Sequence, residues 1–248
     1  MSLKRGINNM GRISFGKSPV EVTYNTDDLS FIISFKGKVY QSDNNNPSYF
    51  IAKDKKKVRF TDALKIEHSE FKTGVGDGVR TKFSGFISNG INYDVTFETY
   101  IWLEHETGYL RFEFIPTKEE KFDLLSVAYP NPLILKKNKN GYSALPIMQG
   151  LLILDEDEQE IKPTLSKRMF SRESYMPWWG QVGDKEGYMA IVETPWDAEY
   201  EYYHAPKEQT SINVSWIASL GKIDYRRKLC LRFFEDCNYV TFCKEYRN

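Results

Sequence analysis

Apolar and polar side chains alternate along most of this chain, and this alternation limits the fold more strictly than any other feature. It is clearest in "NYDVTFETYIWLE" (residues 92–104) and in "YLRFEFIP" (residues 109–116). Successive side chains of a β-strand point to opposite faces, so the first segment places Val95, Phe97 and Ile101 together on one face. The "HETG" turn between the two segments predicts that they form a β-hairpin.

The same alternation predicts further strands throughout the chain. Gly, Pro, Asn and Asp clusters separate them at fairly regular intervals, which is typical of sandwiches and barrels. No repeat of 20 to 50 residues is visible. We therefore expect an all-β fold whose other strands lie near residues 20–24, 29–35, 64–71, 79–86, 124–128, 151–154, 188–192, 198–203, 212–216 and 229–234.

The C-terminus has a different, helical periodicity. We expect a β domain over residues 1–236 and a short helix over 237–248, with Asp236 or Asn238 as the N-cap. The helix could dock on the sandwich or lead into another domain. Its apolar stripe would consist of Tyr239, Val240, Phe242, Cys243 and Tyr246.

Charge and composition exclude several classes of partner. The 34 basic and 34 acidic side chains balance, which gives no electrostatic reason to expect nucleic acid or an anionic membrane. No apolar run approaches the roughly 20 residues that span a bilayer. Residues 1–15 lack the apolar core of a signal peptide, and the compartment stays open between the cytoplasm and, after signal removal, the exterior.

Neither the cysteines nor the histidines suggest a metal site or a cofactor. Three cysteines near the C-terminus, Cys230, Cys237 and Cys243, have no zinc-like spacing and are expected to be reduced and partly buried. The three histidines are far apart in sequence. We expect no metal and no cofactor.

Three polar or glycine-rich segments are interpreted as turns. The acidic run "DEDEQE" (155–160) and the basic run "KDKKK" (53–57) are expected to be solvated. "GVGDGVR" (74–80) superficially resembles a phosphate loop, but no Lys-Ser/Thr and no helix follow it. We expect it to be a turn between two strands.

Acidic residues near position 200 raise the question of glycosidic hydrolysis, which needs two carboxyl groups across the scissile bond. The nearest candidates are Glu193, Asp197, Glu199 and Glu201. The last three would share one face of a strand, and a solvated strand face explains them equally well. The sequence contains no recognisable nucleophile elbow.

The segment 174–200 is the strongest local signal, because it combines aromatic residues with acids. Trp178 and Trp179 follow Pro177, which favours extended backbone, so their indoles should point to opposite faces. One could then be core while the other is free to stack on a pyranose ring. The alternative is that all these rings are core.

Several motifs of the chain resemble those of the N-terminal β-supersandwich domain, of the galactose-mutarotase-like type, of certain large glycoside hydrolases. The nearest comparison is the endo-α-N-acetylgalactosaminidase-like group. The resemblance runs from about Gly74 onward and is carried by "YP" (129–130), "LPIMQG" (145–150), "MPWWG" (176–180), "ETPWDA" (193–198) and the closing "YR" (246–247).

The resemblance implies a two-layered supersandwich that supports a (β/α)8 catalytic barrel absent from this chain and contributes to glycan binding. Its partners would be an oligosaccharide or glycan and the chain's own downstream catalytic domain. The acid and nucleophile of such enzymes are expected on the barrel, so no catalytic residue is assigned here. The candidate carbohydrate-binding residues are Trp178, Trp179, Gln181, Glu193, Trp196 and Asp197.

Two other functions stay open. The chain could be a freestanding sugar-binding module, or an aldose-epimerase-like enzyme that works in the concave face of the sheet. True mutarotases use two histidines and a glutamate in one cleft. His105 falls in an expected hairpin loop and His204 just after an expected strand, which does not match that context.

Overall fold

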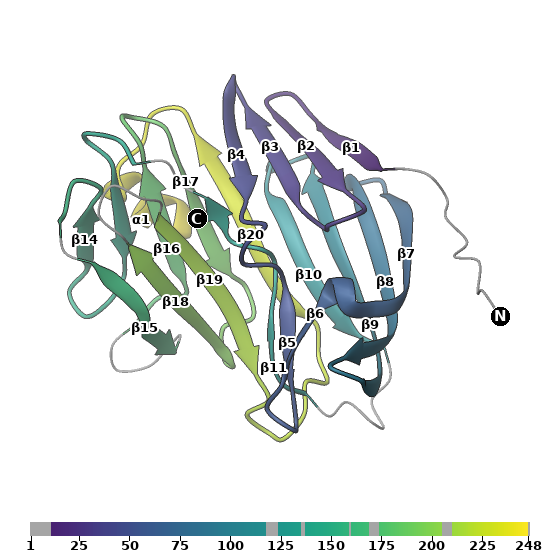
Figure 1. Ribbon diagram of the computed structural model, residues 1–248. Helices are drawn as coiled ribbons and strands as arrows, with labels where there is room; N and C mark the ends of the chain where they lie inside the picture. Colours follow the sequence, from purple (N-terminus) through teal and green to yellow (C-terminus); the bar gives the residue numbers. More distant parts are fainter. Residues whose placement is uncertain are drawn as a thin grey trace.

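The computed structural model describes residues 11–117, 124–134, 137–158, 160–168, 174–204 and 210–247. Nearly all regular structure in this part of the chain is β, in three antiparallel sheets (Figure 1). The expectation that residues 1–15 lack a signal peptide falls mostly on residues 1–10, which lie outside the described residues. No helix that the structure describes has the length and apolar character needed to cross a membrane.

The largest sheet has nine strands and forms one complete layer. In spatial order its strands are β14 (Leu151–Leu154), β13 (Tyr142–Leu145), β16 (Trp178–Val182), β17 (Gly187–Val192), β20 (Arg227–Phe234), β10 (Leu110–Pro116), β9 (Ile91–Glu104), β8 (Gly76–Ser88) and β7 (Ala63–Lys72). The predicted hairpin is confirmed, because β9 pairs with β10 in the register Leu103 to Leu110.

Two smaller sheets lie side by side over one face of the large sheet (Figure 1). The five-stranded sheet consists of β1 (Arg12–Lys17), β2 (Val20–Asn25), β3 (Phe31–Phe35), β4 (Lys38–Ser42) and β12 (Leu133–Ile134). The six-stranded sheet consists of β15 (Ile161–Arg168), β18 (Ala198–His204), β19 (Thr210–Ile217), β11 (Leu124–Ala128), β5 (Tyr49–Ala52) and β6 (Lys57–Arg59). A single 3-10 turn, η1 (Phe60–Asp62), follows β6.

Aromatic rings join the two layers into one core. Phe31 of the five-stranded sheet packs on Phe112 of the large sheet, with ring centroids 5.3 Å apart. At the other end Tyr200 of β18 packs on Trp179 of β16, at 6.3 Å. Rings of this size bury large apolar areas and dominate core energetics. The structure is therefore an all-β sandwich, as the alternation predicts.

The expected C-terminal helix is present as α1 (Tyr239–Arg247). The side-chain Oδ1 of Asn238 accepts hydrogen bonds from the N–H groups of Val240 (2.9 Å) and Thr241 (3.1 Å), so Asn238 is the N-cap. The buried apolar stripe of α1 is narrower than the sequence predicts. Phe242 is fully buried, whereas Tyr239, Val240 and Cys243 are exposed.

The glycine-rich segment 74–80 is only in part a turn. Residues from Gly76 onward belong to β8, and Gly78 lies directly opposite Trp102 of β9. A β-carbon on Gly76 would stand 2.6 Å from Cε3 of Trp102. Gly76 and Gly78 are thus needed because Trp102 lies against the backbone of β8. A bound phosphate is not required to explain these glycines.

Candidate functional site

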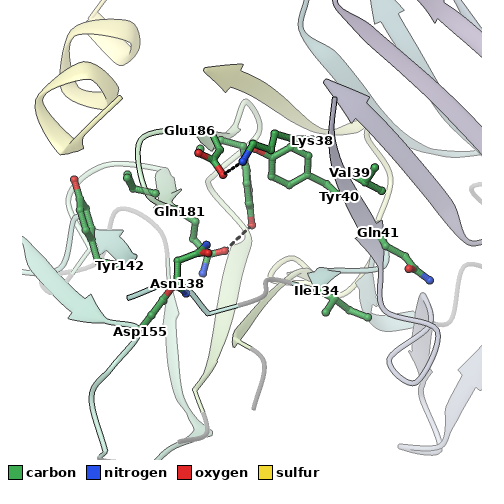
Figure 2. A pocket seen from close by; sticks show the side chains of 14 residues that line it. Lys38, Val39, Tyr40, Gln41, Ile134, Asn138, Tyr142, Asp155, Gln181 and Glu186 are labelled. Carbon is green, nitrogen blue, oxygen red and sulfur yellow. Dashed lines mark hydrogen bonds and ion pairs between the residues drawn. The ribbon is translucent and has the colours of Figure 1, made fainter. Parts of the chain in front are cut away.

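A cleft of about 300 Å³ opens between the edge of β4 and the strands β13, β16 and β17 (Figure 2). One wall comes from residues 38–41 of the five-stranded sheet, and the other from residues 181–188 of the large sheet. Asn138 and Asp155 line it from the loops that flank β13 and β14. Its volume is at the lower end of the range of about 300–1,000 Å³ that is typical of small-molecule sites.

Gln181 belongs to a buried polar network behind this cleft. Its Nε2 donates to Ser143 Oγ (2.8 Å), and its Oε1 accepts from the hydroxyl of Tyr188 (3.3 Å). The hydroxyl of Tyr202 also donates to Ser143 Oγ (3.0 Å). Hydrogen bonds on both sides of the amide hold the Gln181 side chain in one orientation.

An ion pair stands at the mouth of the cleft. Lys38 Nζ lies 2.8 Å from Glu186 Oε1 (Figure 2). The hydrogen bond from Lys38 holds the pKa of the Glu186 carboxyl below its usual value. Since Lys38 is more than half exposed, the pair contributes little to stability and mainly sets the charge at the entrance.

Tyr40 lines the same cleft beside this ion pair. Its ring packs edge-on against Tyr188 (5.9 Å between centroids) and, at a tilt, against Phe233 (5.0 Å). Its hydroxyl is buried and has no hydrogen-bond partner within the described part of the chain. Burial therefore raises the pKa of the Tyr40 phenol, since the phenolate would be poorly solvated.

Asp155 is half-buried, although the sequence predicts that the whole acidic run 155–160 is solvated. Its Oδ2 accepts the backbone N–H of Asn138 (3.0 Å), and burial raises the pKa of its carboxyl. Glu156, Asp157 and Glu158 are exposed, as expected. No local sequence signal separates Asp155 from its neighbours, because its burial depends on the loop that carries Asn138.

Trp178 and Trp179 lie on opposite faces of β16, as expected for adjacent residues of a strand. Trp179 is part of the core between the layers, and Trp178 packs under α1 against Phe242. Both side chains are only 3% exposed. The expectation that one indole is free to stack on a sugar is therefore wrong, because α1 covers the outer side of β16.

Glu193 lies in an ion-pair cluster on the outer face of the large sheet. Arg111 bridges its carboxylate (2.5 Å) and that of Glu104 (2.8 Å). One guanidinium thus holds two carboxylates. This arrangement fixes the position of Glu193, although the single positive charge is shared between two carboxylates.

Asp197 is the charge partner of a buried arginine. Arg227 has a side chain with 0% exposure, and its Nη2 lies 3.1 Å from Asp197 Oδ2. Tyr225 donates its hydroxyl to the same carboxylate (2.7 Å), and Ser219 donates to Oδ1. Trp196, the preceding residue, is 78% exposed and is the most accessible of the candidate residues.

The described residues do not bring the candidate acids and histidines into one catalytic cleft. Glu193 and Asp197 are held by different arginines. His105, in the β9–β10 loop, lies 2.5 Å from the carboxylate of Asp77 in β8. His204, the last residue of β18, is buried beside Lys137 (3.3 Å). Within the described ranges no three His, Cys, Asp or Glu side chains are grouped as a metal site would require.

The chain is similar to part of a solved glycoside hydrolase. No protein-family model and no curated protein matches it. Among solved structures, α-N-acetylgalactosaminidase NagBb from Bifidobacterium bifidum in complex with GalNAc aligns with a TM-score of 0.87 and 29% identity, over 95% of this chain and 38% of that chain. The ligand-free NagBb structure aligns with a TM-score of 0.84 and 28% identity over the same shares. The chain thus spans well under half the length of the enzyme that it matches.

Proposed function

We propose that this chain is an accessory, carbohydrate-associated domain at the N-terminal end of a larger glycoside hydrolase. Its fold would be the galactose-mutarotase-like supersandwich, and it would support a (β/α)8 catalytic domain that these 248 residues do not contain. One observation carries the proposal. Nearly the whole chain aligns at 29% identity, but with only 38% of an α-N-acetylgalactosaminidase.

The chemistry of the described acids supports a role without catalysis. A retaining or inverting glycosidase needs one carboxyl that can donate a proton and another that is free to attack or to activate water. Glu193 is paired with Arg111, and Asp197 compensates the buried Arg227. These carboxylates already serve the fold. The substrate class that we propose for the whole polypeptide is a glycan with α-linked N-acetylgalactosamine.

A contribution to glycan binding is proposed for the loop between β17 and β18. Trp196 presents an indole that is 78% exposed, and indole faces suit the C–H faces of pyranose rings. This observation also favours a second candidate function, a freestanding sugar-binding module. Oligosaccharide titration of the isolated chain distinguishes the roles, because only a freestanding module should bind strongly without a catalytic domain, and it should lose this affinity on the change Trp196→Ala.

The coding sequence that follows codon 248 tests the accessory role. We expect it to continue in frame for about 250 further residues with alternating strands and helices, the size of a (β/α)8 barrel. A stop codon directly after Asn248, with no hydrolase encoded alongside, would contradict the proposal and favour the freestanding module.

A further inference from the structure

The two edge strands of the nine-stranded sheet differ in character. β7, at one edge, carries exposed ion pairs such as that of Lys65 with Glu67 (2.9 Å). β14, at the other edge, has the sequence LLIL and no charged residue. Its side chains Leu152 and Leu154 are 47% and 56% exposed. Proteins normally protect an open sheet edge with charges or cover it with another element, and β14 lacks the charges that β7 has.

The exposed leucines of β14 lie on the side of the sheet that carries the C-terminal helix. Leu154 is directly opposite Tyr142 of β13, and opposite residues of paired strands share a face. Leu152 is opposite Ala144, which belongs to the apolar cluster under α1. The backbone N–H of Tyr239, the first residue of α1, donates to the Tyr142 hydroxyl (3.1 Å). These residues therefore form one surface, the β14–α1 face, defined by Tyr142, Leu152, Leu154 and Tyr239.

The β14–α1 face is only partly covered by the chain itself. Phe242 of α1 is fully buried, but Tyr239 is 48% exposed. In the part of the chain that the structure describes, β14 pairs with β13 alone. Exposed apolar surface that is contiguous across two elements typically marks an interaction site. The occupant must itself be apolar, because these side chains offer it no charge to pair with.

The course of the chain points to one occupant. α1 lies on this side of the sandwich with the C-terminus at its end (Figure 1). A helix of nine residues is about 13 Å long, so residues that follow Asn248 start close to the face. A domain of about 250 residues has a radius of gyration of about 18 Å, which is large enough to reach β14 from that point. Its attachment would also keep it at a high effective concentration.

From this arrangement we infer that the β14–α1 face is the docking surface for the domain that follows Asn248, which packs apolar side chains against Leu152, Leu154 and Tyr239. The inference rests on the proposed function and deepens it, since it names the surface through which this chain supports the catalytic domain. The alignment with only 38% of NagBb leaves ample length for such a domain. A second copy of this chain is the competing occupant, which the test below distinguishes.

Amide hydrogen exchange tests the inference in the 248-residue chain and in the longer polypeptide that the same reading frame encodes. Peptides that cover Leu151–Leu154 should exchange about tenfold more slowly in the longer polypeptide, because the docked domain would suppress local opening of the edge. Peptides that cover β7 (Ala63–Lys72) should exchange at the same rate in both proteins. β7 is thus an internal reference at the opposite edge of the same sheet.

A matched pair of variants separates docking from folding. Leu154→Glu places a charge on the β14–α1 face, and Leu64→Glu is its control because Leu64, in β7, is 64% exposed. In the 248-residue chain both variants should keep the native melting temperature, since both side chains are largely exposed. In the longer polypeptide only Leu154→Glu should abolish the slow exchange of β14.

The inference is overturned if β14 exchanges equally fast in the two proteins, or if Leu154→Glu behaves like Leu64→Glu in the longer polypeptide. It is also overturned if the 248-residue chain forms a dimer in which β14 is protected and Leu154→Glu removes that protection, because a second copy then occupies the face. These results leave the accessory role intact. A stop codon directly after Asn248 would instead contradict the proposed function, and this inference with it.

Discussion

Gly180 lies directly beneath the aromatic ring of Phe242. A β-carbon at position 180 would overlap Cε2 and Cδ2 of that ring, well inside van der Waals contact. Phe242 is fully buried and also packs against Trp178 and Phe234. Because position 180 has no side chain, Phe242 of the C-terminal helix can pack directly on the backbone of β16 at the glycine of the "MPWWG" motif.

The change Gly180→Ala should lower the free energy of unfolding by about 1–3 kcal/mol, because α1 must lift or β16 must shift to admit the methyl group. Urea denaturation monitored by tryptophan fluorescence measures this, since Trp178 lies under the helix. Gly74→Ala is the matched control, as nothing lies within 4 Å of the position that its added methyl group would occupy. Equal stability of the two variants would contradict the claim that Phe242 packs on β16 only because residue 180 is a glycine.

A second prediction concerns Asp197, which compensates the buried charge of Arg227. Asp197→Ala should lower the free energy of unfolding by about 3 kcal/mol, because a fully buried guanidinium would lose its carboxylate. Asp94→Ala, at an exposed position of β9, should change it by no more than about 0.5 kcal/mol. If Asp197→Ala were as stable as the native chain, the acid would be available for another role.

Two carboxyls should give opposite pH dependences. The Arg80 guanidinium holds the pKa of Glu98 below its usual value, so this stabilisation is present above the unfolded pKa of about 4.3 and is lost as pH falls through the folded pKa. Burial raises the pKa of Asp155, so its contribution is present below the unfolded pKa of about 3.9 and is lost as pH rises through the folded pKa.

Urea denaturation between about pH 3 and pH 7 separates the two effects. The advantage of the native chain over Glu98→Gln should shrink toward acid pH. Relative to Asp155→Asn, the native chain should instead gain stability toward acid pH. The same slope for both variants would show that one of the two environments is misassigned.

Much of the strand pattern could be predicted, because it depends on local alternation. The β9–β10 hairpin could be predicted because only five residues, 105–109, join its two strands and each strand has one clearly apolar face. The strands β11 and β14 also begin and end at the expected residues. Both segments are bounded by polar or Pro and Gly residues, which mark their ends.

The order of strands within the sheets could not be predicted in this way. β12 pairs with β4, and β13 pairs with β16, across long stretches of chain that carry no local signal. Alternation also fails in β16, where all five residues are buried. One face of β16 meets the core and the other meets α1, and this second cover is a tertiary effect.

The prediction of the candidate site failed for the same reason, because contacts between segments far apart in the chain carry no local signal. Glu193 and Asp197 were selected because they are close to tryptophans in sequence, but their partners Arg111 and Arg227 come from β10 and β20. The cleft residues Tyr40 and Asp155 were missed for the converse reason. They lie in unremarkable segments and are brought together with Gln181 only by the packing of β4 beside β16 and β17.

The three cysteines should differ sharply in reactivity. Burial raises the pKa of Cys230 and of Cys237 to about 12, so neither forms much thiolate near neutral pH, whereas Cys243 is exposed. A thiol-specific chromogenic disulfide reagent should therefore label one cysteine rapidly in the folded chain and all three in denaturant. Rapid labelling of a second cysteine in the folded chain would show that α1 or β20 opens readily.

The central claim is that this chain supports glycoside hydrolysis without performing it. The most direct test is the rate at which the purified 248-residue chain releases nitrophenol from a nitrophenyl α-N-acetylgalactosaminide, compared with the longer polypeptide that the proposal requires. We expect the chain alone to match buffer and the longer polypeptide to turn over the substrate. Release by the chain alone well above buffer, abolished by Glu193→Gln or Asp197→Asn, would contradict the claim.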